Sequence, residues 1–307
     1  MTSKEEISVS ILEIERFALH DGPGIRSVVF FQGCPLHCPW CANPESQRQG
    51  AHLLHNRAKC TGCGRCEAAC PACTIRLEKT YPVFNRAACT SCRTCEAVCP
   101  RGAIRFAGER VSTARILDIL LRDKAYYQDS GGGVTFSGGE AFQQFEELAD
   151  LLRRCKQNGL HTAVETCGQV PRSRLEAAYP LIDLFLFDLK HADPAKLRKV
   201  TGADRDTVVG GLRYLAGRNP EKVVIRVPVI PGFNFDAPAL EALFSLAAEL
   251  SIRRLHLLPY HTLGMDKYAQ LGLAYPYPEQ PHLLSAADLL PFKERGEKKG
   301  LEIRIGG

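Results

Sequence analysis

Apolar runs separated by amphipathic stretches make up most of the chain. Six of these runs are rich in Val, Ile, Leu and Phe and are mostly continuous, with no regular exchange of apolar and polar positions. Such runs are typical of parallel strands that are buried on both faces of a sheet. We therefore predict strands at Ile25–Gln32, Gly133–Ser137, His161–Glu165, Ile182–Leu189, Val223–Ile230 and Arg254–Pro259.

Between these runs, apolar residues recur with helical spacing. The predicted helices are Thr113–Tyr127, Phe142–Asn158, Arg172–Tyr179, Asp204–Gly217 and Ala237–Leu250, and a last helix at Ser285–Lys299 precedes a short strand at Leu301–Ile305. Alternating strands and helices imply a parallel sheet, either open or rolled into a barrel. Six principal strands are too few for a complete eight-stranded barrel. The pattern predicts an α/β fold built on a partial (β/α)6 TIM-like barrel.

Composition narrows the class of protein. The chain has 307 residues, of which 45% are hydrophobic and 24% charged, so it can bury a sizeable core and is not disordered. No apolar run reaches the roughly 18 residues that span a bilayer. The first ten residues include Lys4, Glu5 and Glu6 and no signal-peptide region, so we expect a cytoplasmic protein without a membrane partner. The net charge of +5 is small and its charged residues are scattered, so the charge gives no reason to expect nucleic-acid binding.

The cysteines are unevenly distributed. Twelve of the fourteen lie between Cys34 and Cys99, and only Cys155 and Cys167 lie beyond. In a reducing compartment, many thiols indicate metal or redox chemistry rather than disulfides. Residues 55–106 contain two nearly identical Cys-rich units that begin 29 residues apart. We therefore expect three segments: residues 1–54 and 107–307 form the barrel, and residues 55–106 form an insert.

Each unit of the insert reads Cys-x2-Cys-x2-Cys-x3-Cys-Pro. This is the bacterial ferredoxin run, in which the fourth cysteine ligates the other cluster. The spacing predicts a ferredoxin-like insert with two [4Fe–4S] clusters, one held by Cys60, Cys63, Cys66 and Cys99 and the other by Cys89, Cys92, Cys95 and Cys70. Structural zinc is the alternative metal. The clusters could relay electrons or be purely structural, and Cys73 reads as a small buried residue rather than a ligand.

A third group, Cys34-x3-Cys38-x2-Cys41, follows the first predicted strand. Three thiolates can coordinate three irons of a [4Fe–4S] cluster and leave the fourth iron without a protein ligand. An open metal position is where a substrate or cofactor can bind, as in catalytic zinc sites. The alternative is a zinc knuckle whose fourth ligand is His37.

Polar residues follow the strands at the end where parallel barrels gather their chemistry. They are Ser137 to Glu140, Glu165 and Thr166, Asp188 to Lys190, Arg226 with the following Pro231 to Asn234, and Tyr260 with His261. Gly138 and Gly139 let a backbone approach a ligand closely. His256 alternates with apolar neighbours and reads as a core residue, so His261 is the better candidate.

These motifs resemble the radical S-adenosylmethionine (SAM) superfamily. The resemblance implies that Cys34, Cys38 and Cys41 hold the catalytic cluster, whose free iron binds SAM, and that one electron yields methionine and a 5′-deoxyadenosyl radical. It places Trp40 near the adenine, and Gly138, Gly139 and Glu140 at the methionine amino group. Lys190 and Arg226 are cations able to bind the methionine carboxylate or ribose, with salt bridges to neighbouring acids as the alternative.

A narrower resemblance is to the glycyl-radical-enzyme activating enzymes, in the branch that carries a ferredoxin insert. It rests on blocks between about residues 14 and 268, including His20–Arg26, Gly33–Leu36, Trp40–Ser46, Ser130–Glu140, Glu165–Thr166, Asp188–Lys190, Arg226–Gly232 and Leu258–His261. The family abstracts a hydrogen atom from a backbone glycine of a partner lyase or dehydratase. A flavodoxin or ferredoxin is the expected reductant.

The same resemblance assigns two further groups of residues. Glu165, Thr166 and Asp188 match positions that help to bind a monovalent cation near the cofactor carboxylate. The turn Asp21, Gly22, Pro23 and Gly24 is a candidate docking edge for the partner's glycine loop, with a structural turn as the alternative. Two other functions stay open: a radical SAM enzyme that acts on a small molecule, and a ferredoxin-like electron carrier with a non-catalytic barrel. The identity of the partner and the oligomeric state are not encoded in any recognisable motif.

Overall fold

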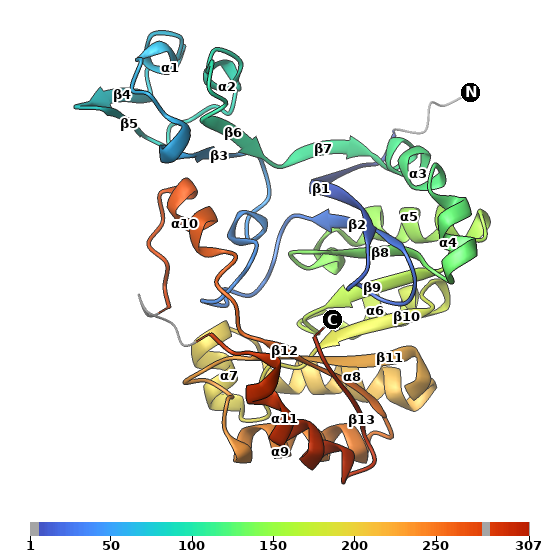
Figure 1. Cartoon of the computed structure of the whole chain (residues 1–307). Coiled ribbons are helices and arrows are strands. Elements are labelled where there is room, and N and C mark those ends of the chain that lie inside the picture. The colour runs from blue at the N-terminus through green and yellow to red at the C-terminus, as the bar shows by residue number, and fades with distance from the viewer. Residues whose placement is uncertain (1–5, 278–282, 307) are drawn as a thin grey trace.

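A computed structural model describes residues 6–277 and 283–306 of the chain. One mixed sheet runs through the larger part of the molecule, and a small Cys-rich unit projects from it (Figure 1). The sheet order is β13-β12-β11-β10-β9-β8-β2-β1-β7. Among the described residues its two edge strands do not pair with each other, so the sheet is open rather than a closed barrel.

The six predicted parallel strands are confirmed, and they lie side by side in the middle of the sheet. They are β2 (Arg26–Phe31), β8 (Gly133–Gly138), β9 (Thr162–Thr166), β10 (Leu184–Asp188), β11 (Val223–Val229) and β12 (Arg254–Pro259). Strand β13 (Glu302–Ile305) adds in parallel to β12, as predicted for the chain's last strand. These strands are almost completely buried because helices cover one face of the sheet and polar side chains fill the other.

Two antiparallel strands extend the sheet beyond β2, and the sequence pattern did not reveal them. β1 (Ser8–Ala18) pairs with β2, and β7 (Glu109–Ser112) pairs with β1. β1 contains Glu13, Glu15 and Arg16 and is exposed over much of its second half. It therefore lacks the continuous apolar run that identified the central strands. The six-strand expectation is corrected to a nine-stranded mixed sheet.

The helices follow the prediction with three changes. The predicted helices are observed as α5 (Phe145–Gln157), α6 (Arg172–Ala178), α8 (Arg205–Arg218), α9 (Ala237–Glu249) and α11 (Ala286–Glu297). The helix expected at Thr113–Tyr127 is divided into α3 (Thr113–Leu121) and α4 (Lys124–Ser130). The break lets the buried carboxylate of Asp123 reach Arg16 and the hydroxyl of Ser27. Two short helices were not predicted, α7 (Pro194–Thr201) and α10 (Met265–Leu271).

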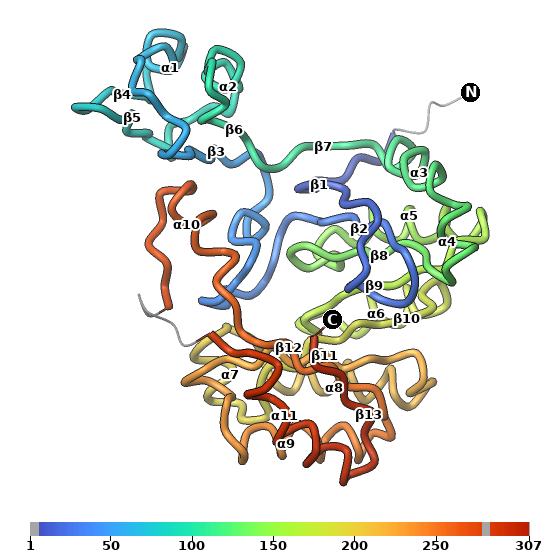
Figure 2. Tube along the Cα trace, viewed as in Figure 1, coloured from blue at the N-terminus to red at the C-terminus, as the bar shows by residue number. Residues whose placement is uncertain are grey.

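The Cys-rich unit is built from two short antiparallel strand pairs and two one-turn helices. β3 (His52–His55) pairs with β6 (Ile104–Ala107), and β4 (Ile75–Glu78) pairs with β5 (Tyr81–Phe84). Helix α1 (Arg65–Ala68) and helix α2 (Thr94–Ala97) occupy equivalent places in the two sequence repeats. The chain leaves the sheet after the loop that carries Cys34, Cys38 and Cys41, which we call the cysteine loop. It returns through β6 into β7, and α10 lies below β3 (Figure 2).

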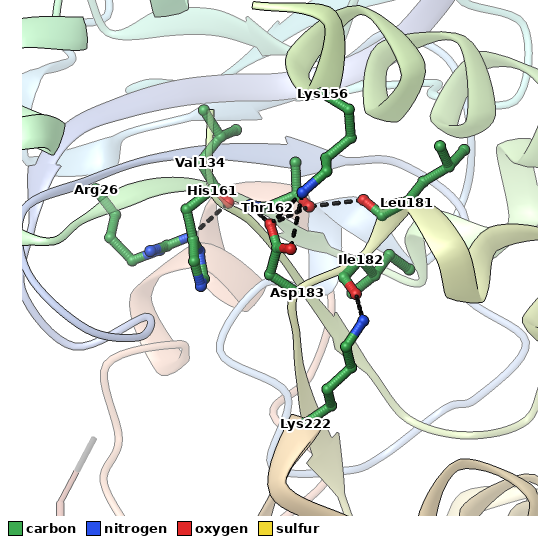
Figure 3. Close-up of polar contacts among 9 residues, drawn as sticks. All are labelled: Arg26, Val134, Lys156, His161, Thr162, Leu181, Ile182, Asp183 and Lys222. Carbon is green, nitrogen blue, oxygen red and sulfur yellow. Dashed lines mark hydrogen bonds and ion pairs between the residues drawn. The ribbon is translucent and has the colours of Figure 1, made fainter. Parts of the chain in front are cut away.

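The amino ends of the parallel strands carry a polar network of their own (Figure 3). The carboxylate of Asp183 accepts from Lys156 at 2.8 Å and from the Thr162 backbone N–H at 2.9 Å. The Arg26 guanidinium donates to the Val134 carbonyl at 2.6 Å. Because the chemistry of parallel α/β folds gathers at the opposite, carboxyl ends of the strands, this network serves to hold the strands together.

No helix in the described part of the chain is long and apolar enough to cross a bilayer.

Candidate functional site

The cysteine loop follows β2, and its backbone is hydrogen-bonded to two other segments and to itself. The Cys34 N–H donates to the Gln47 carbonyl at 3.3 Å, the His37 N–H to the Thr201 carbonyl at 3.1 Å, and the Cys41 N–H to the Cys38 carbonyl at 3.1 Å. The thiols of Cys34, Cys38 and Cys41 all line one cavity. His37 is exposed and lies outside that lining, so the zinc knuckle with His37 as fourth ligand has no support in this geometry.

The cavity has a volume of about 210 Å³ and opens to solvent at the carboxyl ends of the strands. Most of the residues singled out in the sequence meet there: Cys34, Cys38, Trp40, Cys41, Gly138, Gly139, Glu165, Thr166, Asp188, Lys190 and His261. Glu140, Arg226 and the turn Asp21–Gly24 lie outside this lining. The sequence did not single out Ala42, Asn43, Ser46, Gln47, Cys167 or Pro228, which complete much of the wall.

Gly138 and Gly139 bring bare backbone to the cavity. A Cβ on Gly138 would lie 2.4 Å from the Phe31 backbone, and Gly138 has φ +107°. A Cβ on Gly139 would lie 2.4 Å from the Gly33 carbonyl oxygen. The Gly139 N–H donates to the Phe31 carbonyl at 2.8 Å. Only glycine fits this close contact between the end of β8 and the start of the cysteine loop.

Glu140 is fully buried beneath that glycine wall. One carboxylate oxygen accepts from the Thr166 hydroxyl at 2.9 Å and from the Cys167 N–H at 2.8 Å. The other oxygen accepts from the Phe142 N–H at 3.3 Å. Burial raises the pKa of Glu140, and these hydrogen bonds oppose the rise. The carboxylate therefore joins the ends of β8 and β9 in this structure, and its predicted contact with an ammonium group stays a prediction.

Lys190 and Asp188 form a buried ion pair at the end of β10. The Nζ–Oδ2 distance is 2.6 Å, and the Lys190 side chain is 9% exposed. Burial alone would lower the pKa of Lys190, but Asp188 and the nearby Cys38 thiol outweigh it and raise the pKa. The Oδ1 atom of Asp188 is buried without a hydrogen-bond partner. A buried, unpaired carboxylate oxygen facing a cavity is a place for a donor or a cation.

Arg226 connects the inside of the barrel to the predicted docking turn. Its guanidinium lies 3.2 Å from Glu165 Oε1 and 4.0 Å from Asp21 Oδ1. Glu165 also accepts from the Ser137 hydroxyl at 2.5 Å. Burial raises the pKa of Glu165, and the positive charge of Arg226 opposes the rise. Arg226 thus forms the salt bridges to neighbouring acids that were the alternative to binding SAM. Its role toward SAM stays a prediction.

The docking turn Asp21–Gly24 packs against the strands rather than standing free. The Asp21 carbonyl accepts from the Thr135 hydroxyl at 2.7 Å. A Cβ on Gly24 would meet the Gly132 nitrogen at 2.4 Å, and Gly24 has φ +64°. The turn is therefore well defined in position, whichever function it has.

Trp40 lines the cavity and is held by other aromatic rings. Its ring lies 4.8 Å from that of Phe233 and 6.2 Å from that of Tyr277, measured between centroids. The Trp40 side chain is 9% exposed, so it is both a packing residue and part of the cavity wall. His261 follows β12 and is exposed at the rim of the same cavity.

Cys167 is the residue of chemical interest that sequence reasoning left unassigned. Its thiol lies against that of Cys34, and this contact raises the pKa of Cys167 and lowers that of Cys34. Its backbone N–H binds Glu140. The signal for this contact was its position directly after Glu165 and Thr166, but the pairing depends on how the ends of β2 and β9 meet.

The insert brings together the four cysteines of the first predicted group, and Cys73, which was expected to be a small buried residue, is exposed. Cys60, Cys63 and Cys66 line one pocket with Cys99 from the other repeat. In the second group, the Thr94 hydroxyl lowers the pKa of Cys92, and the Thr74 hydroxyl lowers that of Cys70. No three His, Cys, Asp or Glu side chains within residues 6–277 and 283–306 are close enough to hold a single metal ion. The thiols surround shared spaces, as a multi-iron cluster requires.

The chain matches the model of the radical SAM superfamily over residues 60–243. A trans-4-hydroxy-L-proline dehydratase activating enzyme of Clostridioides difficile is 38% identical over 97% of this chain and 99% of its own length. The pyruvate formate-lyase 2-activating enzyme of Escherichia coli (strain K12) is 35% identical over 100% of this chain and 95% of its own.

A choline trimethylamine-lyase activating enzyme of Oleidesulfovibrio alaskensis is 38% identical over 91% of this chain and 92% of its own length. Among solved structures, Streptococcus suis SuiB bound to the precursor peptide SuiA superposes with TM-score 0.53 and 16% identity, covering 91% of this chain and 48% of that one, which is a likeness of fold. With the family model and the curated relatives in agreement, the chain belongs to the radical SAM superfamily and, within it, to the glycyl-radical-enzyme activating enzymes.

Proposed function

We propose that this chain generates its radical in the cavity at Cys34, Cys38 and Cys41 and delivers it to a backbone glycine of a partner lyase or dehydratase. The observation that carries the proposal is the convergence of these three thiols with the glycine wall of β8 on one cavity. The relatives' names, which include a lyase and a dehydratase activating enzyme, support that class of partner.

The residues of the cavity fit the cofactors that the family implies. Three thiols can hold a [4Fe–4S] cluster and leave one iron open. Bare backbone at Gly138 and Gly139 leaves room for a ligand where a side chain would not fit. A cluster in this place supplies the single electron that cleaves SAM into methionine and a 5′-deoxyadenosyl radical.

The protein's own part is to bind, orient and shield. The backbone at Gly138 and Gly139 receives the methionine amino group, and Lys190 provides a positive charge for the methionine carboxylate. Trp40 offers an aromatic face for the adenine, and His261 stands at the cavity rim near Pro228. Exclusion of water and of other hydrogen donors protects a reactive radical until the glycine is in place.

A monovalent cation completes our proposal for the cavity. Glu165, Thr166 and Asp188 are its candidate ligands, and all three line the cavity. The buried, unpartnered Oδ1 of Asp188 supports a cation there, because hard oxygen ligands suit such ions. The partner's glycine loop is proposed to dock along Asp21–Gly24, since Asp21 reaches Arg226 inside the barrel.

For the insert, residues 55–106 between barrel segments 1–54 and 107–307, we propose two further [4Fe–4S] clusters, giving three in all. The insert carries nine Lys or Arg residues against three Glu. That positive charge suits an acidic one-electron carrier such as a flavodoxin or ferredoxin as reductant. Because the eleven proposed ligands must remain reduced thiolates, we place the protein in the cytoplasm.

The test is anaerobic activation of a co-encoded glycyl radical enzyme. Reconstituted protein, SAM and reductant are mixed with that partner, and the sample is examined by electron paramagnetic resonance. We expect the doublet of a glycyl radical together with 5′-deoxyadenosine. Deoxyadenosine without a doublet, for every partner tried, would favour a radical SAM enzyme that acts on a small molecule.

A further inference from the structure

The two Cys-rich repeats of the insert are alike in sequence but differ in their surroundings. We call the group Cys60, Cys63, Cys66 and Cys99 the first site, and the group Cys89, Cys92, Cys95 and Cys70 the second site. The pocket at the first site is lined only by insert residues, all between Cys60 and Ile104. The second site, in contrast, also borders a cleft that faces the barrel.

A cleft of about 410 Å³ separates the second site from the barrel. On the insert side it is lined by Arg86, Cys89 and Ser91. On the barrel side it is lined by Pro44, Glu45, Gln47 and Arg48 and by Leu271 and Leu273 at the end of α10. None of the four cysteines of the first site lines this cleft. Of the two sites, only the second therefore contributes a ligand cysteine to the surface that faces the cysteine loop.

Residues 43–48 form the wall between this cleft and the cavity at Cys34, Cys38 and Cys41. Asn43 and Ser46 line the cavity, Glu45 and Arg48 line the cleft, and Gln47 lines both. The Gln47 side chain lies next to the Cys41 thiol and the Tyr268 hydroxyl. Its carbonyl accepts from the Cys34 N–H at 3.3 Å.

Contacts from α10 and from the insert hold this wall in place. Lys267 donates to Asn43 Oδ1 and to Glu45 Oε1, each at 2.7 Å. The Ser91 hydroxyl donates to the Ala51 carbonyl at 3.1 Å. The Arg86 guanidinium donates to the Gln270 carbonyl at 3.0 Å. The second site is thus tied to the barrel by direct contacts on both sides of the cleft.

We infer that the two insert sites are ordered, with the second site as the inner one, coupled to the Cys34–Cys38–Cys41 cavity through Gln47, and the first site as the outer one. This inference rests on the proposed function of the insert. A low-potential one-electron carrier delivers one electron at the outer site, the electron passes to the inner site and then to the barrel, and no bond is made or broken. Tunnelling rates fall steeply with distance, so the order of the sites decides the path.

Matched double variants test the order. Cys89→Ala with Cys92→Ala removes the second site, and Cys60→Ala with Cys63→Ala removes the same two positions of the first. Each protein is loaded with iron and sulfide, reduced with dithionite and examined by electron paramagnetic resonance. The signal that shifts on adding SAM identifies the barrel cluster. Its microwave power saturation then measures magnetic coupling to a neighbouring cluster.

We expect loss of the fast relaxation of the barrel signal in the second-site variant and its retention in the first-site variant. Loss in the first-site variant alone, or equal behaviour of the two, would overturn the order. A third variant, Gln47→Leu, keeps all eleven proposed ligand cysteines. It tests the inference if a double variant fails to fold. It should shift the reduction potential of the SAM-responsive signal and leave the insert signals unchanged; an unaltered potential would contradict a bridging role for Gln47.

The same samples separate this inference from the proposed function. Dithionite reaches the barrel without the insert, so deoxyadenosine should form in every variant that still binds SAM. If the wild-type protein forms none, the proposed function fails. If it forms deoxyadenosine but the two variants show the reverse relaxation pattern, only the order of the sites fails.

Discussion

The barrel's Cys38 and two cysteines of the insert, Cys63 and Cys92, carry the same chemical group in different surroundings, although the insert also buries one thiol, that of Cys95. Cys38 is buried, and burial raises the pKa of its thiol to about 12. Cys63 and Cys92 are exposed, and the Thr94 hydroxyl lowers the pKa of Cys92. In the barrel, negative charge on the ligands is balanced by the buried Lys190, whereas the insert uses backbone N–H groups and hydroxyls.

This difference matches the two reactions that we propose, radical formation in the barrel and electron transfer in the insert. A site that makes a carbon radical must sit at the bottom of a shaped cavity, away from water. A site that only passes an electron needs to be near its donor, and exposure brings it nearer. The barrel therefore places its three thiols around one cavity at the strand ends, whereas the insert leaves the thiols of Cys63 and Cys92 exposed. Each prediction below tests one side of this contrast.

The largest effect is expected from Cys38→Ala. Losing one of three cluster ligands in the cavity should reduce deoxyadenosine formation to background and remove the SAM-responsive paramagnetic signal. Chromatography of deoxyadenosine with dithionite as reductant measures it. Cys92→Ala should retain deoxyadenosine formation under the same conditions, as should Cys155→Ala, a buried cysteine remote from the cavity. Equal losses in Cys38→Ala and Cys92→Ala would remove the contrast.

Gly139→Ala should come next. The added Cβ would lie 2.4 Å from the Gly33 carbonyl oxygen, so the cysteine loop or β8 must move. We expect a stability loss of about 3 kcal/mol together with weaker SAM binding. Thermal unfolding and a SAM titration of the loaded protein measure both. Gly210→Ala is the control, because its Cβ meets nothing within 4 Å, and a similar loss there would point to a general sensitivity of glycine positions.

The junction between the two regions depends on Lys267. Lys267→Met would leave the carboxylate of Glu45, which is 5% exposed, without its ion-pair partner. A buried unpaired charge costs about 3 kcal/mol, and partial exposure of Lys267 reduces this to about 2 kcal/mol. Chemical unfolding measures the loss. Adding Glu45→Gln should restore much of it, and no recovery would mean that the lysine acts through something other than this charge.

The smallest effect concerns pH and the inside of the barrel. Burial and the charges of Arg226 and Arg304 lower the pKa of His256 to about 4, below its ordinary 6.5. The unfolded chain then binds more protons between these values, so stability falls as pH decreases from 6.5 toward 4. His256→Asn should remove about 1–2 kcal/mol of that fall. Unfolding at pH 7.5 and at pH 5.5 measures it, and an identical slope in the variant would exclude His256 as its source.

Much of the parallel sheet could be predicted from the sequence because it is encoded locally. The strands that lead to Glu165 and Asp188 are apolar runs in the sequence. Once these strands are placed, the polar residues at their ends are placed as well. β1 was missed because its charged residues interrupt the apolar pattern. Helices α7 and α10 were also missed, although the predicted helix α6 is no longer than they are.

The meeting of Cys60, Cys63, Cys66 and Cys99 in one pocket was also predictable, since the ferredoxin spacing names the crossing cysteine. The contact of Cys167 with Cys34 was not, because it depends on the ends of two strands far apart in the sequence. The same holds for Gln47, which reads as a loop residue until the chain folds back between the cavity and the insert. Arg226 could be identified as a charge inside the barrel but not as the partner of both Glu165 and Asp21.

The most direct test of the central claim follows a hydrogen atom. The partner enzyme is prepared with deuterated glycine, activated anaerobically with this protein, SAM and reductant, and the deoxyadenosine is analysed by mass spectrometry. We predict deuterium in the deoxyadenosine, in step with growth of the glycyl radical doublet. Deoxyadenosine that forms in the partner's presence and contains no deuterium would contradict hydrogen abstraction from a partner glycine.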